Sequence, residues 1–239
     1  MTLVADLSVF GNALTFAVDH SDLLWDKTVE HVELSAAAVG IALVIALPLG
    51  VLLGHLQRFS WIAISVANVG RALPTLAVIA VLLVFMPIGS TVVAIALIVL
   101  AVPPILTNAY VGVSEVDHET VEAARGMGMN EWQILRRVEL PLATPLVFAG
   151  IRTAVVYVVA SATIAAIAGG GGLGEIIVNQ AGYRIEGVVA ASLLVSALAF
   201  AADAAVAGVQ WLVTPKPLRG RHAEDATLVT DAGEAHLSV

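Results

Sequence analysis

The sequence predicts an all-α, polytopic membrane protein with five transmembrane helices. Of its 239 residues, 59% are hydrophobic and only 13% are charged, whereas a soluble domain is about half apolar and a quarter charged. The apolar runs are continuous and do not alternate every second residue, which favours helical spans over barrel strands. Ala, Val, Leu and Ile dominate beside 20 Gly, a composition typical of closely packed transmembrane helices.

Five apolar stretches are long enough to cross a bilayer core of about 30 Å. The first holds 21 uncharged residues. Residues 72–114 carry no charge, and a turn at residues 86–90 divides this stretch between the second and third spans. A short amphipathic or surface helix in residues 3–18 is the alternative that would change the count. The predicted spans are at about residues 34–54, 61–85, 91–109, 143–168 and 187–213.

Basic residues in short loops predict the orientation. If the polar stretch 113–141 is inside the cell, the opposite side holds only Lys27 and Arg184. We therefore predict an external N-terminal segment at residues 1–30 and a flexible cytoplasmic tail at residues 214–239. The inner side then holds seven basic residues: Arg58, Arg125, Arg136, Arg137, Lys216, Arg219 and Arg221.

Several classes of protein are excluded or disfavoured by the composition and the motifs. The chain has no cysteine, so it has no disulfide, catalytic thiol or Cys-based metal site, and its net charge of −8 is not that of a nucleic-acid-binding protein. His118 and Glu122 fall short of the zinc-protease HExxH pattern because the second His is absent. We predict no metal site and no cofactor bound by this chain.

A glycine-rich stretch at residues 169–174 formally matches a dinucleotide fingerprint through Gly169, Gly171 and Gly174. It follows a membrane span and not a strand, so that interpretation fails. A flexible external turn is the simpler interpretation, and a gate along a transport pathway is the alternative.

The polar insert at residues 113–141 separates the third and fourth spans. Residues 113–127 suit a helix with Ser114 as its N-cap, and acidic residues in the first turns favour the helix dipole. Gly126 and Gly128 weaken this helix and permit a sharp turn.

A second short helix follows that turn. Asn130 is a suitable cap for a helix over residues 131–138, and Leu140 with Pro141 is expected to end this helix before the fourth span. The insert is therefore predicted to be two short helices that meet at a glycine corner.

The insert resembles the Glu-Ala-Ala loop of ABC importer permeases. Its pattern is Glu-Ala-Ala, three residues, Gly, nine residues and Val-x-Leu-Pro, and only the Val differs from the family's Ile. The resemblance implies a MetI-like ABC permease fold over roughly residues 30–213. The pattern occupies Glu122, Ala123, Ala124, Gly128, Val138, Leu140 and Pro141.

The resemblance also implies how transport is powered. In that family, the loop is a coupling helix that sits in a groove of a cytoplasmic ATP-hydrolysing subunit. Carried over, Glu122, Ala123, Ala124 and Gly128 form the docking corner, while Leu140 and Pro141 fix the exit into the fourth span. This chain would then be a non-catalytic subunit, with ATP and Mg²⁺ on the partner.

The implied assembly lies in a prokaryotic inner membrane. It holds two ATP-binding subunits, a second permease copy or a sister permease, and an external solute-binding protein. Residues 68–76 and 169–177 look like segments of osmoprotectant importers, which carry glycine betaine, carnitine, choline or proline. An importer for methionine or an oxyanion, and an ion-coupled secondary transporter that uses Asp203, stay open as alternatives.

The candidate residues of the transport pathway are predicted from charges within apolar sequence and from Gly and Pro residues. Arg71 and Asp203 are the charges deepest in apolar sequence, where charge usually marks function or pairing. Arg71 could instead snorkel toward the membrane surface, and Asp203 could have a structural partner. Trp61, Tyr157 and Tyr183 could face a quaternary ammonium group, but such residues are commonly interfacial anchors. The candidates are Asn68, Arg71, Pro74, Gly171, Gly174 and Asp203.

Overall fold

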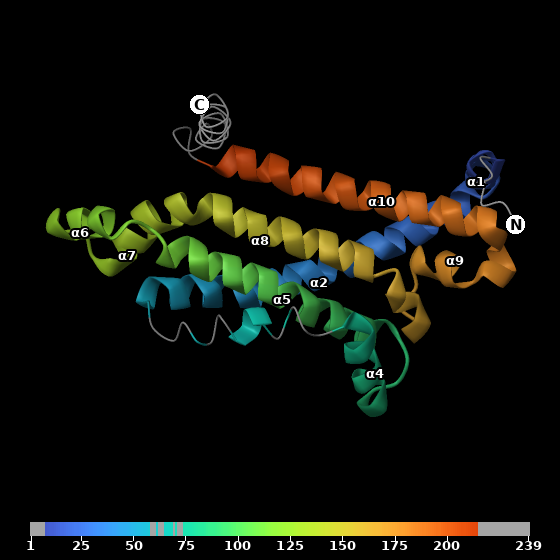
Figure 1. The fold of residues 1–239 in the computed structure, drawn as a ribbon, viewed down its shortest axis with the longest axis horizontal. Helices are drawn as coiled ribbons and strands as arrows, with labels where there is room; N and C mark the ends of the chain where they lie inside the picture. Colours follow the sequence, from blue (N-terminus) through green and yellow to red (C-terminus); the bar gives the residue numbers. More distant parts are fainter. Residues whose placement is uncertain (1–7, 58–60, 62–64, 69, 71–73, 215–239) are drawn as a thin grey trace, which may run out of the picture.

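The computed structural model describes residues 8–57, 61, 65–68, 70 and 74–214, and all regular structure in these ranges is helical. Four long helices lie side by side along the long axis of the molecule (Figure 1). Within the described ranges, four helical stretches are long and apolar enough to cross a membrane. The predicted all-helical membrane architecture is therefore confirmed. The long helices are α2 (Ser21–Leu56), α5 (Ser90–Ser114), α8 (Leu140–Ser161) and α10 (Gln180–Val213).

Short helices lie at the two ends of this bundle (Figure 1). One end, here called the corner end, carries α6 (His118–Gly126) and α7 (Glu131–Ile134). The opposite end, here called the loop end, carries three short elements. They are α1 (Ser8–Asp19), the 3₁₀ helix η2 (Ile164–Ala168) and α9 (Gly174–Val178).

Two helices bear directly on the predicted span count. The short helix α4 (Thr75–Phe85) is the continuously described part of the second predicted span, and Pro74 immediately precedes it. The N-terminal helix α1 has 12 residues, which is too short to cross a bilayer. It packs against α10, where Phe16 lies over Gly187.

Close contact between α2 and α5 holds the centre of the bundle together. A Cβ atom added to Gly50 would lie 2.5 Å from the Leu106 carbonyl oxygen, and one added to Gly54 would lie 2.7 Å from that of Tyr110. These glycines are four residues apart, so both face α5. Small residues at such positions let the helix backbones approach closely. The buried core beside them is also rich in alanine: Ala38, Ala42, Ala46, Ala96, Ala101 and Ala154.

The prediction that Ser114 caps the first insert helix is wrong. Ser114 is instead the last residue of α5, and its hydroxyl donates to the Val111 carbonyl at 3.3 Å. The next helix starts at His118, because Asp117 accepts the Glu119 N–H at 3.2 Å as its N-cap. A carboxylate is a strong acceptor at a helix N-terminus, and it sets the start of α6.

The prediction that Leu140 and Pro141 end the second insert helix is also wrong. A π turn, η1 (Leu135–Glu139), joins α7 to α8, and the Leu140 N–H donates to the Leu135 carbonyl. Proline has no N–H and its ring needs space beside the preceding turn. The wider π turn supplies this space, so the helix continues through the proline into the membrane span.

The fourth membrane helix ends seven residues earlier than the predicted span at residues 143–168. The helix α8 ends at Ser161 and the chain continues as η2. The Ala168 carbonyl accepts the Gly89 N–H at 2.9 Å, which turns this apolar segment toward the connection between α4 and α5. Apolar composition alone does not distinguish a continued span from such a packed return.

Candidate functional site

The corner between α6 and α7 is a Schellman turn, which explains its glycine. The Met129 N–H donates to the Ala124 carbonyl at 3.2 Å, and the Gly128 N–H donates to the Arg125 carbonyl at 3.0 Å. This pair of bonds needs a left-handed residue just past the helix end, and Gly128 has φ +83°. Asn130 then begins α7 with a capping box shared with Gln133. The predicted glycine corner and the Asn130 cap are confirmed.

Ion pairs within α6 and between α6 and α7 stabilise this corner. Arg125 contacts Glu122 within α6 and reaches Glu131 of α7 with two N–O distances of 3.2 Å. At the start of α6, hydrogen bonds from the Thr120 hydroxyl and the Glu119 N–H hold the pKa of Asp117 below its ordinary value. The cap therefore stays ionised at neutral pH, and the corner keeps its shape there.

The corner presents a mixed surface away from the bundle. Ala124 is buried at 1% exposure, so it packs the corner onto the molecule, whereas its neighbour Ala123 is exposed. Met127 is 71% exposed and Trp132 is 66% exposed. An exposed Met beside charged residues is typical of a protein contact surface.

The corner is rigidly connected to the membrane helices. Ile134 is fully buried, and the buried carboxylate of Glu139 lies 2.6 Å from Nδ1 of His55 on α2. The corner is therefore joined to α2 by the His55–Glu139 contact and to α8 by η1, which runs directly into that helix. Leu140 and Pro141 lie at this junction, where the resemblance predicted the exit into the fourth span.

A second feature is a polar cavity between α5 and α8. Its volume is about 410 Å³. Thr107 and Asn108 from α5 and Thr153 and Tyr157 from α8 supply its polar atoms. The Thr107 hydroxyl is buried without a hydrogen-bond partner among the described residues. The remaining lining residues are Ala67, Gly70, Leu100, Pro103 and Pro104.

This cavity lies on a face that is poorly suited to lipid. Tyr157 is 53% exposed and lies four residues before the end of the apolar helix α8. Polar side chains within a membrane helix usually face a partner helix or a water-filled passage. Of these residues, the sequence singled out only Tyr157, as an aromatic that could face a quaternary ammonium group or be an interfacial anchor. The four-residue spacing of Thr153 and Tyr157 places both on one helix face.

The glycine-rich stretch packs against the loop end of the bundle, where residues 171–174 are buried. Gly171 and Gly174 are both buried, and Gly171 has φ +74°. The Gly172 N–H donates to the Glu30 carboxylate at 2.9 Å. A Cβ atom on Gly174 would lie only 2.1 Å from the Thr163 carbonyl oxygen. Glycine is therefore required at Gly174 by close backbone packing.

A lysine joins this loop to α2. Lys27 contacts Glu30 at 2.8 Å and Glu175 at 2.6 Å. Beside them, buried His31 donates from Nε2 to the Val159 carbonyl at 2.9 Å. Three polar residues of α2 thus bind both the end of α8 and the loop that follows it.

The other predicted pathway residues are dispersed. Asp203 pairs with Arg152 of α8, with N–O distances of 2.7 Å for both contacts. Asn68 and Pro74 are exposed. Asn68 lies next to Ala67, a residue of the polar cavity lining. Arg71 lies outside the described residues.

A bundle of long apolar helices with a projecting polar corner is the architecture of a polytopic membrane protein. Residues 46–210 match the family model described as "Binding-protein-dependent transport system inner membrane component". The chain belongs to this family, and the predicted resemblance to ABC importer permeases is confirmed.

Curated relatives cover most of the chain. It is 36% identical to the glycine betaine/carnitine/choline transport system permease protein OpuCB of Bacillus subtilis over 87% of this chain and 96% of that protein. It is 34% identical to the osmoprotectant import permease protein OsmW of Salmonella typhimurium over 87% of this chain and all of that protein.

Solved structures share the fold. A chain from an inward-facing structure of the MetNI methionine ABC transporter matches with a TM-score of 0.73 and 23% identity. The match covers 82% of this chain and 99% of that chain.

Proposed function

We propose that this chain is the permease subunit of an ATP-driven importer for compatible solutes of the glycine betaine, carnitine, choline and proline class. ATP and Mg²⁺ bind to separate ATPase subunits, and this chain is not itself an enzyme. The N-terminus lies outside the cell and the C-terminus in the cytoplasm, which places the corner end inside. An external solute-binding protein delivers the solute.

The observation that carries the proposal is the geometry of the corner. The Schellman turn at Gly128 fixes two short helices at a set angle, and Glu122, Ala123 and Met127 lie on its exposed part. A rigid projection that continues into α8 is suited to passing movement of an ATPase pair to the membrane spans. Switching between inward-open and outward-open states would follow from that movement.

The polar cavity supports a pathway formed between two permease chains. Thr107, Asn108, Thr153 and Tyr157 offer neutral hydrogen-bonding groups and an aromatic face. Such groups suit a zwitterion or a quaternary ammonium solute, because aromatic faces attract cations and hydroxyls and amides solvate carboxylates. A second copy or a sister permease would close the exposed side of this face.

The solute class rests on the relatives, whose printed names include glycine betaine, carnitine and choline. Exchange of the solute-binding protein tests it directly. Uptake of radiolabelled glycine betaine with an osmoprotectant-binding protein supports the class. Uptake only with a methionine-binding or oxyanion-binding protein would reassign the solute and leave the importer mechanism intact.

The docking role is tested by two matched glycine substitutions. Gly128→Ala places a Cβ atom on a left-handed residue, whereas Gly126→Ala adds one at an ordinary helical residue with nothing within 4 Å. The left-handed conformation costs a non-glycine residue about 1–2 kcal/mol, so association with the ATPase should fall about tenfold.

Gly126→Ala should leave co-purification with the ATPase unchanged, because alanine favours the helix. Both variants are first checked for equal membrane insertion. Equal ATPase binding by both variants would argue against docking at this corner.

A further inference from the structure

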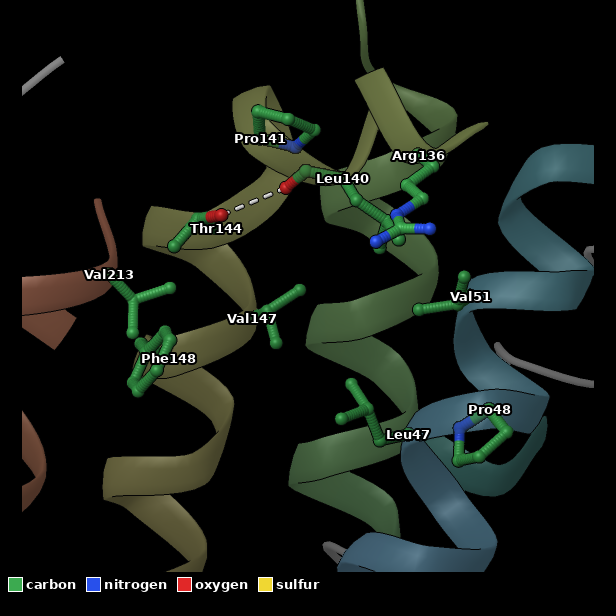
Figure 2. Close-up of a pocket in the computed structure, with 10 residues that line it drawn as sticks. All are labelled: Leu47, Pro48, Val51, Arg136, Leu140, Pro141, Thr144, Val147, Phe148 and Val213. Atoms are coloured by element: carbon green, nitrogen blue, oxygen red, sulfur yellow. Dashed lines mark hydrogen bonds between the residues drawn. The ribbon is translucent and has the colours of Figure 1, made fainter. Parts of the chain in front are cut away.

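A groove about 440 Å³ in volume lies near the corner end, between α2, α8 and the end of α10. Figure 2 shows apolar side chains along its length and Arg136 at its upper end, next to Leu140. The lining residues from Leu140 to Phe148 span eight positions of α8, which is about 12 Å at 1.5 Å per residue. The apolar lining includes Leu47, Val51, Val147, Phe148 and Val213.

Arg136 is the charged group of this groove, and its guanidinium has no carboxylate within 4.0 Å among the described residues. Three other arginines of the described ranges, Arg125, Arg152 and Arg184, each contact a carboxylate. Arg136 is exposed and lines the groove together with apolar side chains. An unpaired cation above an apolar channel is complementary to an anionic amphiphile.

Two tryptophans place the groove mouth at the level of a membrane surface. Trp132 precedes Arg136 by one helical turn and is 66% exposed, and Trp211 is 61% exposed two residues before Val213. Exposed tryptophans at the ends of membrane helices gather at the headgroup level. Arg136 therefore lies where phosphates are found, and the apolar lining lies where acyl chains are found.

Hydrogen-bonding groups that could select a polar peptide are scarce in the groove. The Thr144 hydroxyl already donates to the Leu140 carbonyl at 2.9 Å. Pro48 and Pro141 have no backbone N–H to offer. A ligand of this groove can therefore be recognised only by one positive charge and an apolar surface.

We propose that this groove binds one anionic phospholipid, with its phosphate on Arg136 and one acyl chain along Val147 and Phe148. The lipid would contact α2, α8 and α10 together, next to the π turn that connects the corner to the bundle. It would thereby bind at the junction through which corner movement reaches the spans. This site is separate from the polar cavity and does not depend on which solute is carried.

The test measures which lipids the full-length chain retains. The protein is reconstituted in nanodiscs with equal phosphatidylglycerol and phosphatidylcholine, and bound lipids are counted by native mass spectrometry after release. The wild-type chain should retain phosphatidylglycerol preferentially. Arg136→Gln should lower the ratio of the two retained lipids roughly tenfold, because a hydrogen bond between a charged side chain and the lipid phosphate is lost.

Two variants control for general surface charge and for loss of fold. Arg137→Gln removes the neighbouring exposed charge, which is not part of the groove lining. Because an exposed charge is screened by salt and solvent, this variant should leave the ratio within about twofold of wild type. Arg136→Lys keeps the charge and should retain most of the preference. Equal Tm values in detergent confirm that each variant is folded.

Three outcomes would overturn the proposal. The first is an unchanged lipid ratio in Arg136→Gln. The second is an equal fall in Arg137→Gln, which would indicate diffuse attraction to the membrane surface. The third is a several-fold rise in bound phosphatidylglycerol when the chain is truncated after Thr214, because the C-terminal tail would then be the occupant of the groove.

Discussion

Arg152 of α8 and Asp203 of α10 form a two-pronged ion pair, with both N–O distances at 2.7 Å. The pair joins two helices at the depth of the membrane spans. A paired carboxylate is poorly placed to act as a coupling-ion site, so this contact favours a structural role over the ion-coupled alternative for Asp203. It also gives the aspartate the structural partner that sequence reasoning expected without naming it.

Removal of one charge of this ion pair should lower the free energy of unfolding more than removal of both charges. Asp203→Asn leaves Arg152 as an unpaired charge between membrane helices, which should lower stability by about 1–2 kcal/mol, less than for a fully buried pair because both groups are partly exposed. The double variant with Arg152→Gln should recover most of this loss. Thermal unfolding in detergent measures each change, and a double variant no more stable than Asp203→Asn would contradict the pairing.

The hydrogen bond between Glu30 and Gly172 should protect the glycine-rich loop from hydrogen exchange. Glu30→Ala removes the acceptor of the Gly172 N–H, and a hydrogen bond to a charged group is worth about 1.5–3 kcal/mol. Hydrogen exchange at the Gly172 amide should therefore accelerate at least about tenfold. Glu33→Ala, an exposed carboxylate on the same helix, is the control. Unchanged exchange in Glu30→Ala would show that the loop is held by its packing alone.

Two glycines of α2 should respond differently to the same substitution. Gly50→Ala would bring a Cβ atom to 2.5 Å from a backbone oxygen of α5, whereas Gly40 has nothing within 4 Å. Gly50→Ala should therefore lower Tm by about 5 °C through overpacking. Gly40→Ala should leave Tm equal or slightly higher, because alanine favours the helix. A similar loss in both variants would contradict the close approach of α2 and α5.

Local signals predicted the corner well. Asn130 with Gln133, and Gly128 in the left-handed conformation, act through bonds between residues at most five positions apart. Such bonds depend on the residues that form them more than on the rest of the fold. The apolar spans were predictable for a similar reason, since the bilayer sets their length and composition.

Contacts between residues far apart in the chain could not be predicted from the sequence. Nothing near Asp203 indicates that its partner lies 51 positions earlier, and nothing in residues 162–168 indicates that they turn toward Gly89. The π turn before Pro141 arises because a continuous helix must accommodate a proline at a junction fixed by buried Ile134 and Leu135. The polar cavity exists only when α5 and α8 are packed together.

We propose that ATP hydrolysis by a partner subunit, transmitted through the Gly128 corner, drives solute import through this chain. The most direct measurement is uptake of radiolabelled glycine betaine into proteoliposomes that hold the complete transporter, its solute-binding protein and ATP. Uptake should require an active ATPase and fall to background with a hydrolysis-dead ATPase. Uptake that persists with the inactive ATPase would contradict the account.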